Sequence, residues 1–158
     1  MIRIETDAWE TMAAHAQAAY TDECCGALVG AVDGDVKTVT AALPLDNVWP
    51  GDQRRRYELR PEDLLRVTAT ARTRGLKLIG IYHSHPDCDA YFSDTDLVNS
   101  CPWYSFVVLS VKRGKVDRAA AFLPDREQRR AVPEALVYPP ANTTVSETDS
   151  GAGSQACE

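Results

Sequence analysis

Hydrophobic and polar residues follow two different periods along this chain, and the period predicts which segments form helices and which form strands. Apolar residues recur at helical spacing from about residue 6 to 20 and from 61 to 75, which predicts two amphipathic helices. Short apolar runs bounded by turn residues predict strands. We expect these strands at residues 2–4, 24–32, 36–43, 57–59, 78–85, 104–111 and 116–123, with a short helix over 93–101.

Length and composition predict one domain followed by a tail. The chain has 158 residues and a net charge of −6, which is enough length to bury a core. Residues 139–158 contain almost no large apolar side chain, so burial cannot offset the entropy lost on ordering them. We therefore predict a folded domain over residues 1–138 and a disordered tail over residues 139–158.

Charge and hydropathy also limit the expected surroundings and partners. The negative net charge argues against nucleic acid or an anionic membrane as the partner. The sequence shows neither a signal-peptide pattern nor an apolar run of membrane-spanning length. We therefore expect a cytoplasmic protein.

The predicted strand over residues 78–85 ends in two histidines separated by one residue. Residues i and i+2 of a strand point to the same face, about 6.5–7 Å apart, so His83 and His85 can lean onto one metal ion. Downstream, the segment 93–96 has the form of a helix capping box that begins at Ser93. Its Asp96 is either only part of a helix start or also a third metal ligand near the positive end of a helix dipole.

Two histidines and one carboxylate would leave the fourth position of a tetrahedral zinc ion open for water, as in catalytic zinc sites. Cys88, in the intervening loop, is an alternative ligand because a thiolate binds zinc well. The five cysteines include no C-x-x-C pair, so a separate structural zinc site is not evident.

These residues together resemble the motif of a known family. The string His83-x-His85-x7-Ser93-x-x-Asp96, preceded by Glu23 at a strand start, resembles that of the JAMM/MPN+ metallopeptidases, also called the JAB or Mov34 superfamily. The resemblance runs from about residue 2 to about residue 124 and includes every motif position. One departure is local, because Phe92 stands where many members have proline before the motif serine.

The resemblance implies a fold and a site. The implied fold is of the α/β (α+β) type, a mixed β-sheet flanked by helices and related to the cytidine-deaminase-like fold. The implied cofactor is one zinc ion per chain, held by His83, His85 and Asp96. Glu23, which alone would read as a solvated residue, would be the general base and proton shuttle. Ser93 would donate a hydrogen bond to the oxyanion that forms during amide hydrolysis.

The resemblance also implies a substrate class. Small prokaryotic members cut the amide bond after the C-terminal glycine of a ubiquitin-like or sulfur-carrier protein, so we expect a partner that ends in Gly-Gly. An isopeptide bond, a linear peptide bond and a carrier–amino-acid bond stay open, as do a link to sulfur or cysteine metabolism and a homodimer. A basic, aromatic-bearing loop could suit an acidic carrier, with candidate contacts from Asn47, Trp49, Arg54, Arg55 and Arg56; the alternative for this loop is a solvated surface.

Two functions of other classes compete with a zinc peptidase. Family members that have lost the ligands serve as non-catalytic interaction scaffolds, although the ligands and Glu23 are all present here. A zinc deaminase is disfavoured because its His-x-Glu and Pro-Cys-x-x-Cys signature is absent.

Overall fold

A computed structural model describes residues 1–140 and 142–144 of the chain. The helices are α1 (Thr6–Ala19), α2 (Pro61–Thr73) and α3 (Asp94–Val98). The strands are β1 (Ile2–Ile4), β2 (Cys25–Asp33), β3 (Val36–Leu45), β4 (Lys77–Pro86), β5 (Ser105–Lys112), β6 (Lys115–Pro124), β7 (Ala131–Glu134), β8 (Leu136–Tyr138) and β9 (Asn142–Thr144).

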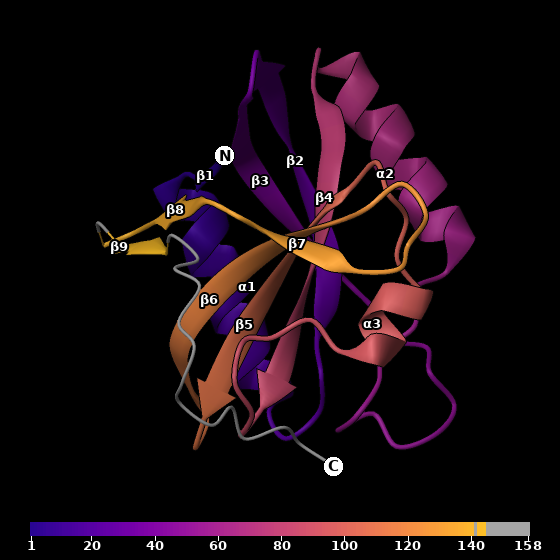
Figure 1. Ribbon diagram of the computed structural model, residues 1–158, viewed down its shortest axis with the longest axis vertical. Coiled ribbons are helices and arrows are strands. Elements are labelled where there is room, and N and C mark those ends of the chain that lie inside the picture. Colours follow the sequence, from indigo (N-terminus) through magenta and orange to yellow (C-terminus); the bar gives the residue numbers. More distant parts are fainter. Residues whose placement is uncertain (141, 145–158) are drawn as a thin grey trace.

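Across the described residues, all of these strands form one mixed sheet with the order β7-β6-β5-β4-β2-β3-β1-β8-β9 (Figure 1). Strand β4 lies near the middle, antiparallel to β2 and parallel to β5. Its side chains are buried from Ile79 to His85, as expected for a strand covered on both faces. The predicted α+β fold, a mixed sheet flanked by helices, is confirmed.

The two long helices cover opposite faces of the sheet. Leu28 of β2 belongs to the core that includes Met12 of α1. Its neighbours Ala27 and Val29 pack instead with Val67 of α2. Because successive side chains of a strand point to opposite faces, the two helices lie on different sides. In Figure 1, α1 passes behind β5 and β6, whereas α2 and α3 lie to the right of β4.

Most predicted elements are found close to their expected bounds. Both long helices are confirmed, and a turn at Gly34, which has a φ of 55°, joins β2 to β3. The strand expected at residues 57–59 is wrong, because that segment has no ladder partner among the described residues. Strands β7 and β8 were not predicted. No helix among the described residues is long and apolar enough to cross a membrane.

The start of the predicted tail contains one further strand. Residues Asn142–Thr144 form β9 and pair antiparallel with β8. This is ordered backbone inside a segment whose composition predicts disorder. Residues 141 and 145–158 lie outside the described part of the chain, so the domain boundary at residue 138 stays a prediction.

Candidate metal centre

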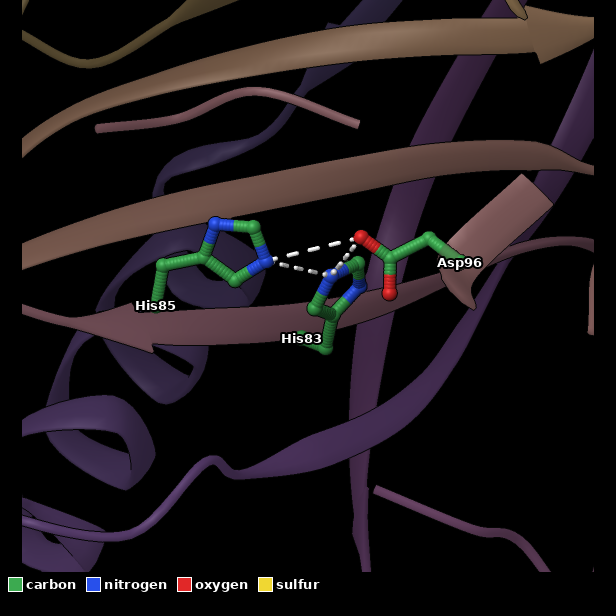
Figure 2. Close-up of side chains that lie close together, drawn as sticks. All are labelled: His83, His85 and Asp96. Atoms are coloured by element: carbon green, nitrogen blue, oxygen red, sulfur yellow. Dashed lines mark hydrogen bonds and ion pairs between the residues drawn. The ribbon is translucent and has the colours of Figure 1, made fainter. Parts of the chain in front are cut away.

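The fold brings the two histidines and the carboxylate of the sequence motif together. His83 and His85 project from the same face of β4, whose register is fixed by pairing with β2 and β5. Asp96 comes from α3 (Figure 2). The Nε2 atoms of the two histidines lie 3.2 Å apart, and they lie 3.3 and 3.5 Å from Oδ2 of Asp96. All three side chains are buried.

These distances fit one small metal ion. Three donors bound to a tetrahedral zinc ion at about 2.0–2.1 Å stand about 3.3–3.4 Å from one another, close to the spacing of the three atoms here. Among the described residues, His83, His85 and Asp96 are the one group of three potential ligands whose donor atoms lie within 4.8 Å of one another. Cys88 is not part of this group, which disfavours the alternative ligand.

The surroundings of each histidine orient its Nε2 toward the shared point. His85 Nδ1 lies 3.0 Å from the carbonyl oxygen of Asp89, so Nδ1–H donates there and leaves the Nε2 lone pair for a metal. The His83 ring stacks on Tyr57 with 4.6 Å between ring centroids. Burial lowers the pKa of His83 although Asp96 opposes the shift, which favours the neutral imidazole that metals bind.

The capping box predicted at residues 93–96 is confirmed. Ser93 N–H donates to Asp96 Oδ2 at 2.9 Å, and Asp96 N–H donates to Ser93 Oγ at 3.0 Å. Burial alone would raise the pKa of Asp96, but the charges and hydrogen bonds of His83 and His85 outweigh it and hold the pKa well below its usual range. Asp96 is therefore ionised, as a metal-ligating carboxylate must be.

Glu23 lies beside this group, two residues before β2. Its Oε1 is 4.0 Å from His85 Nε2, and the side chain is buried. Burial and then the negative charge of Asp96 raise the pKa of Glu23 to about 9. A divalent cation held by the cluster would place positive charge beside Glu23 and Asp96 and favour the ionised form of both groups. The donor chemistry of the cluster thus fits a metal ion.

A cavity of about 620 Å³ reaches the cluster at His85. Glu23 and Ser93 also line it, as do the basic side chains of Arg54 and Arg55. The Arg54 guanidinium is paired with Asp52, with Nε 2.9 Å from Oδ1. Of the five predicted substrate contacts, these two arginines lie at the cavity.

The other three predicted substrate contacts lie within the loop itself. The Asn47 side chain hydrogen-bonds to main-chain groups of the loop and of Glu23. The Arg56 guanidinium lies 3.8 Å above the ring of Trp49. Trp49 and Arg56 therefore pack against each other, and neither they nor Asn47 are among the residues that line the cavity.

The departure at Phe92 has a structural role. Its ring stacks on Phe122 with 5.5 Å between centroids and lies 5.3 Å from the ring of Phe106. Aromatic packing therefore holds the residue before Ser93, at the position where many family members use proline.

Sequence analysis missed three contributors to the site: Tyr57, Tyr91 and the carbonyl of Asp89. The Tyr91 ring packs edge-on against His85 with 4.9 Å between centroids. An aromatic residue within the short polar loop before Ser93 was a usable signal for Tyr91. The carbonyl of Asp89 has no signal in the sequence, because every residue carries one.

Comparisons with known proteins agree with this geometry. Residues 5–123 match the family described as prokaryotic homologues of the JAB domain. A relative from Haloferax volcanii named desampylase is 37% identical over 114 residues, which cover 69% of this chain and 80% of that protein.

Solved structures share the fold. A solution structure of a protein from Desulfitobacterium hafniense has a TM-score of 0.76 at 28% identity, covering 87% of this chain and 92% of that chain. A solution structure of a protein from Salinibacter ruber has a TM-score of 0.66 at 31% identity, covering 92% of this chain and 96% of that chain. The crystal structure of a JAB1/MPN domain protein from Archaeoglobus fulgidus has a TM-score of 0.54 at 18% identity, covering 87% of this chain and 99% of that chain. At this identity the likeness is evidence of a shared fold only. The family match, which spans most of the chain and all of the clustered motif residues, establishes that this protein belongs to the prokaryotic homologues of the JAB domain.

Proposed function

We propose that this protein is a zinc-dependent hydrolase that releases a ubiquitin-like or sulfur-carrier protein by cutting the amide bond after its C-terminal glycine. The observation that carries the proposal is the buried group of His83, His85 and Asp96, with donor atoms 3.2–3.5 Å apart, beside Glu23. Membership of the JAB family and the relative named desampylase support an isopeptide bond as the bond cut.

His83, His85 and Asp96 would hold the zinc ion. When bound, zinc supplies Lewis-acid chemistry, polarising the scissile carbonyl and activating a water molecule. The chain's own contribution is to keep two imidazole nitrogens and one ionised carboxylate converged in a buried position.

Glu23 and Ser93 would handle the proton and the developing charge. Glu23 lines the cavity, and a cation held beside it would lower its raised pKa and favour the ionised form. That carboxylate would take a proton from the attacking water and deliver it to the leaving amine. Ser93 Oγ accepts the Asp96 N–H, which leaves its own O–H free to donate. That donor would stabilise the oxyanion formed at the scissile carbonyl.

Arg54 and Arg55 would contact the substrate from the cavity wall. Positive side chains there suit an acidic carrier surface and favour encounter with it. We propose that the extended C-terminal tail of the carrier enters below these arginines and reaches the cluster. Asn47, Trp49 and Arg56 would act by keeping the loop in shape rather than by direct contact.

The test is a cleavage assay on carriers that end in Gly-Gly. A panel of ubiquitin-like proteins would be joined through the C-terminus to the lysine ε-amine of a fluorescent peptide, to a linear fusion partner, or to a single amino acid. We expect the zinc-loaded protein to cut the isopeptide-linked probe and Glu23→Gln to lose at least about 10²-fold in rate. Glu10→Gln, on the exposed face of α1, is the matched control and should keep full activity.

Two outcomes would overturn the proposal. One is a zinc-loaded parent that cuts none of the three kinds of probe, which would favour a scaffold function. The other is full activity in Glu23→Gln, which would remove Glu23 from the reaction. Cleavage of only the linear or the amino-acid-linked probe would keep the hydrolase and overturn the isopeptide assignment.

A further inference from the structure

We propose that Asn47 is the positioning residue of Glu23, because it fastens the loop over residues 46–58 to the main chain of Glu23. The inference rests on the proposed function, in which Glu23 moves the proton. It assigns to Asn47 a role in chemistry instead of the substrate contact that the sequence suggested.

Glu23 has no sheet partner that could hold it. Strand β2 begins at Cys25, so the main chain of Glu23 lies outside the ladder. Both of its polar main-chain groups are bound by the loop instead. Glu23 N–H donates to the Gln53 carbonyl at 2.7 Å, and Asn47 Nδ2 donates to the Glu23 carbonyl at 3.1 Å.

The next residue is held from a different side. Cys24 N–H donates to Ser84 Oγ at 2.9 Å, and Ser84 N–H donates to the Cys24 carbonyl at 3.1 Å. Ser84 is the residue between the two histidines of β4. The backbone that carries Glu23 is therefore fixed between the metal-binding strand and the loop, and removal of either anchor frees one end.

Asn47 uses its full hydrogen-bonding capacity in this arrangement. Its Nδ2 donates to the carbonyls of Glu23 and Arg56, and its Oδ1 accepts from Trp49 N–H and Glu58 N–H, each at 3.1 Å. An asparagine side chain has two protons to donate and one oxygen with two lone pairs. All four are engaged, so no hydrogen-bonding group of Asn47 remains for a substrate.

The loop is rigid enough to transmit this restraint. Gln53 Nε2 donates to the carbonyls of Asn47 and Trp49, at 2.9 Å each. The Arg56 guanidinium covers the Trp49 ring. Loops whose own side chains fill their interior behave as compact units, so Asn47 holds Glu23 against a defined body.

The three metal ligands are supported by other elements, β4 and α3. A substitution that breaks the Asn47–Glu23 contact should therefore misplace Glu23 and spare the metal. Tyr57 connects the loop to the metal ligands, since it stacks on His83 and lies between the Asn47-bound residues Arg56 and Glu58. Zinc content is accordingly measured beside activity.

The variant that isolates the contact is Asn47→Asp. Aspartate keeps the shape of asparagine and an acceptor for the N–H groups of Trp49 and Glu58, but it places an oxygen against the carbonyls of Glu23 and Arg56. We expect kcat on the isopeptide-linked probe to fall roughly 10- to 100-fold, the effect of a misplaced catalytic group, with KM and zinc content unchanged. Gln17→Glu adds the same charge on α1, keeps the acceptor for Val116 N–H, and should leave kcat unchanged.

A second pair of variants separates positioning from a general effect on the loop. In a Glu23→Gln background, Asn47→Asp should cost no further activity, because a residue that acts through Glu23 has nothing left to position. Asn47→Ala introduces no charge and should show the same loss of kcat at constant KM.

The outcomes are distinguishable. An equal loss from Asn47→Asp in both backgrounds, a rise in KM with kcat unchanged, or loss of zinc would each overturn the positioning role. Full activity of Asn47→Asp beside an inactive Glu23→Gln would overturn this inference alone. Full activity of Glu23→Gln would instead overturn the proposed function on which it rests.

Discussion

At the residue scale, one carboxylate oxygen, Oδ2 of Asp96, takes part both in the helix capping box and in the candidate metal cluster. It accepts the Ser93 N–H of the helix capping box at 2.9 Å and lies 3.3 and 3.5 Å from the two histidine nitrogens. The cap therefore points the carboxylate at the place where the two histidine nitrogens converge. Such preorganisation avoids an ordering cost when the ion binds.

The metal assignment predicts zinc stoichiometry. Protein purified without added metal should carry about one zinc ion per chain, as expected for a site with three protein ligands and an open fourth position. A His83→Ala/His85→Ala double variant should carry none, as measured by elemental analysis. His15→Ala is the control, because His15 instead contacts the Tyr82 hydroxyl at 2.8 Å, and it should retain zinc. Zinc retained in the double variant would place the ion on other groups and contradict the assignment.

Two substitutions of Ser93 should separate its effect on the stability of α3 from its effect on catalysis. Glycine is a nearly adequate N-cap, costing only a few tenths of a kcal/mol, whereas alanine costs about 1 kcal/mol. Ser93→Gly should therefore keep zinc and most of the free energy of unfolding but lose roughly 10²–10³-fold in kcat with the oxyanion donor. Ser93→Ala should lose kcat to the same extent and also lower the free energy of unfolding by about 1 kcal/mol. Denaturant unfolding and the cleavage assay check this together, and full activity in Ser93→Gly would remove the hydroxyl from the chemistry.

At the scale of elements, strand β4, which carries both histidines, depends on a close approach to its neighbour. A Cβ atom at Gly80 would lie 2.1 Å from the carbonyl oxygen of Ser105, the residue that it faces on β5. No side chain fits there without separating the two strands. Glycine at this position therefore keeps β4 and β5 in register just before the histidines.

Gly80→Ala should lower the free energy of unfolding by about 1–3 kcal/mol or more, the usual cost of overpacking. It should also weaken zinc binding, because a shifted β4 carries both histidines. Gly34→Asn is the control: no atom lies within 4 Å of a Cβ there, and asparagine tolerates the positive φ of 55°. Urea denaturation and zinc titration of both variants measure these effects, and an unperturbed Gly80→Ala would show that the strands can move apart freely.

At the scale of the whole molecule, the site depends on the complete fold. Glu23 precedes β2, the histidines end β4, and Asp96 lies in α3. The main core lies between α1 and the sheet, away from the cluster. We therefore expect the protein to fold without the metal, in contrast to small zinc domains that unfold without it.

Zinc should nevertheless raise the stability of the native state by mass action. At a free zinc concentration of 100 times Kd, the gain in the free energy of unfolding is about 2.7 kcal/mol. Thermal unfolding followed by circular dichroism should show a folded protein in chelator and a higher Tm with zinc. The His83→Ala/His85→Ala variant should show no zinc-dependent shift. A parent that unfolds in chelator would contradict the metal-independent core.

The sequence revealed the parts of this molecule that depend on local pattern. The helical stripes gave α1 and α2, and the spacing of His83, His85, Ser93 and Asp96 gave the metal cluster. Strand β7 was not predicted because it is only four residues long and contains Pro133. Proline argues against a strand unless the strand lies at the edge of a sheet. The extended residues 57–59 were taken for a strand because propensity cannot tell whether a ladder partner exists.

The contacts of the loop over residues 46–58 could not be predicted from a local pattern. The contact from Asn47 to Glu23 spans 24 positions, and the partner is a main-chain carbonyl that has no sequence signature. The fold likewise places His15 Nδ1 2.8 Å from the hydroxyl of Tyr82, 67 positions away. Contacts between positions so far apart in the sequence become visible only when the fold is known.

The loop over residues 46–58 also bears on protein engineering. It contributes Arg54 and Arg55 to the cavity wall and, through Asn47 and Gln53, holds the backbone of Glu23. Exchanging this loop would therefore also remove the support of Glu23, the proton carrier of the proposed function. A loop graft should keep Asn47 and both hydrogen bonds to the Glu23 main chain, and vary only the residues between them.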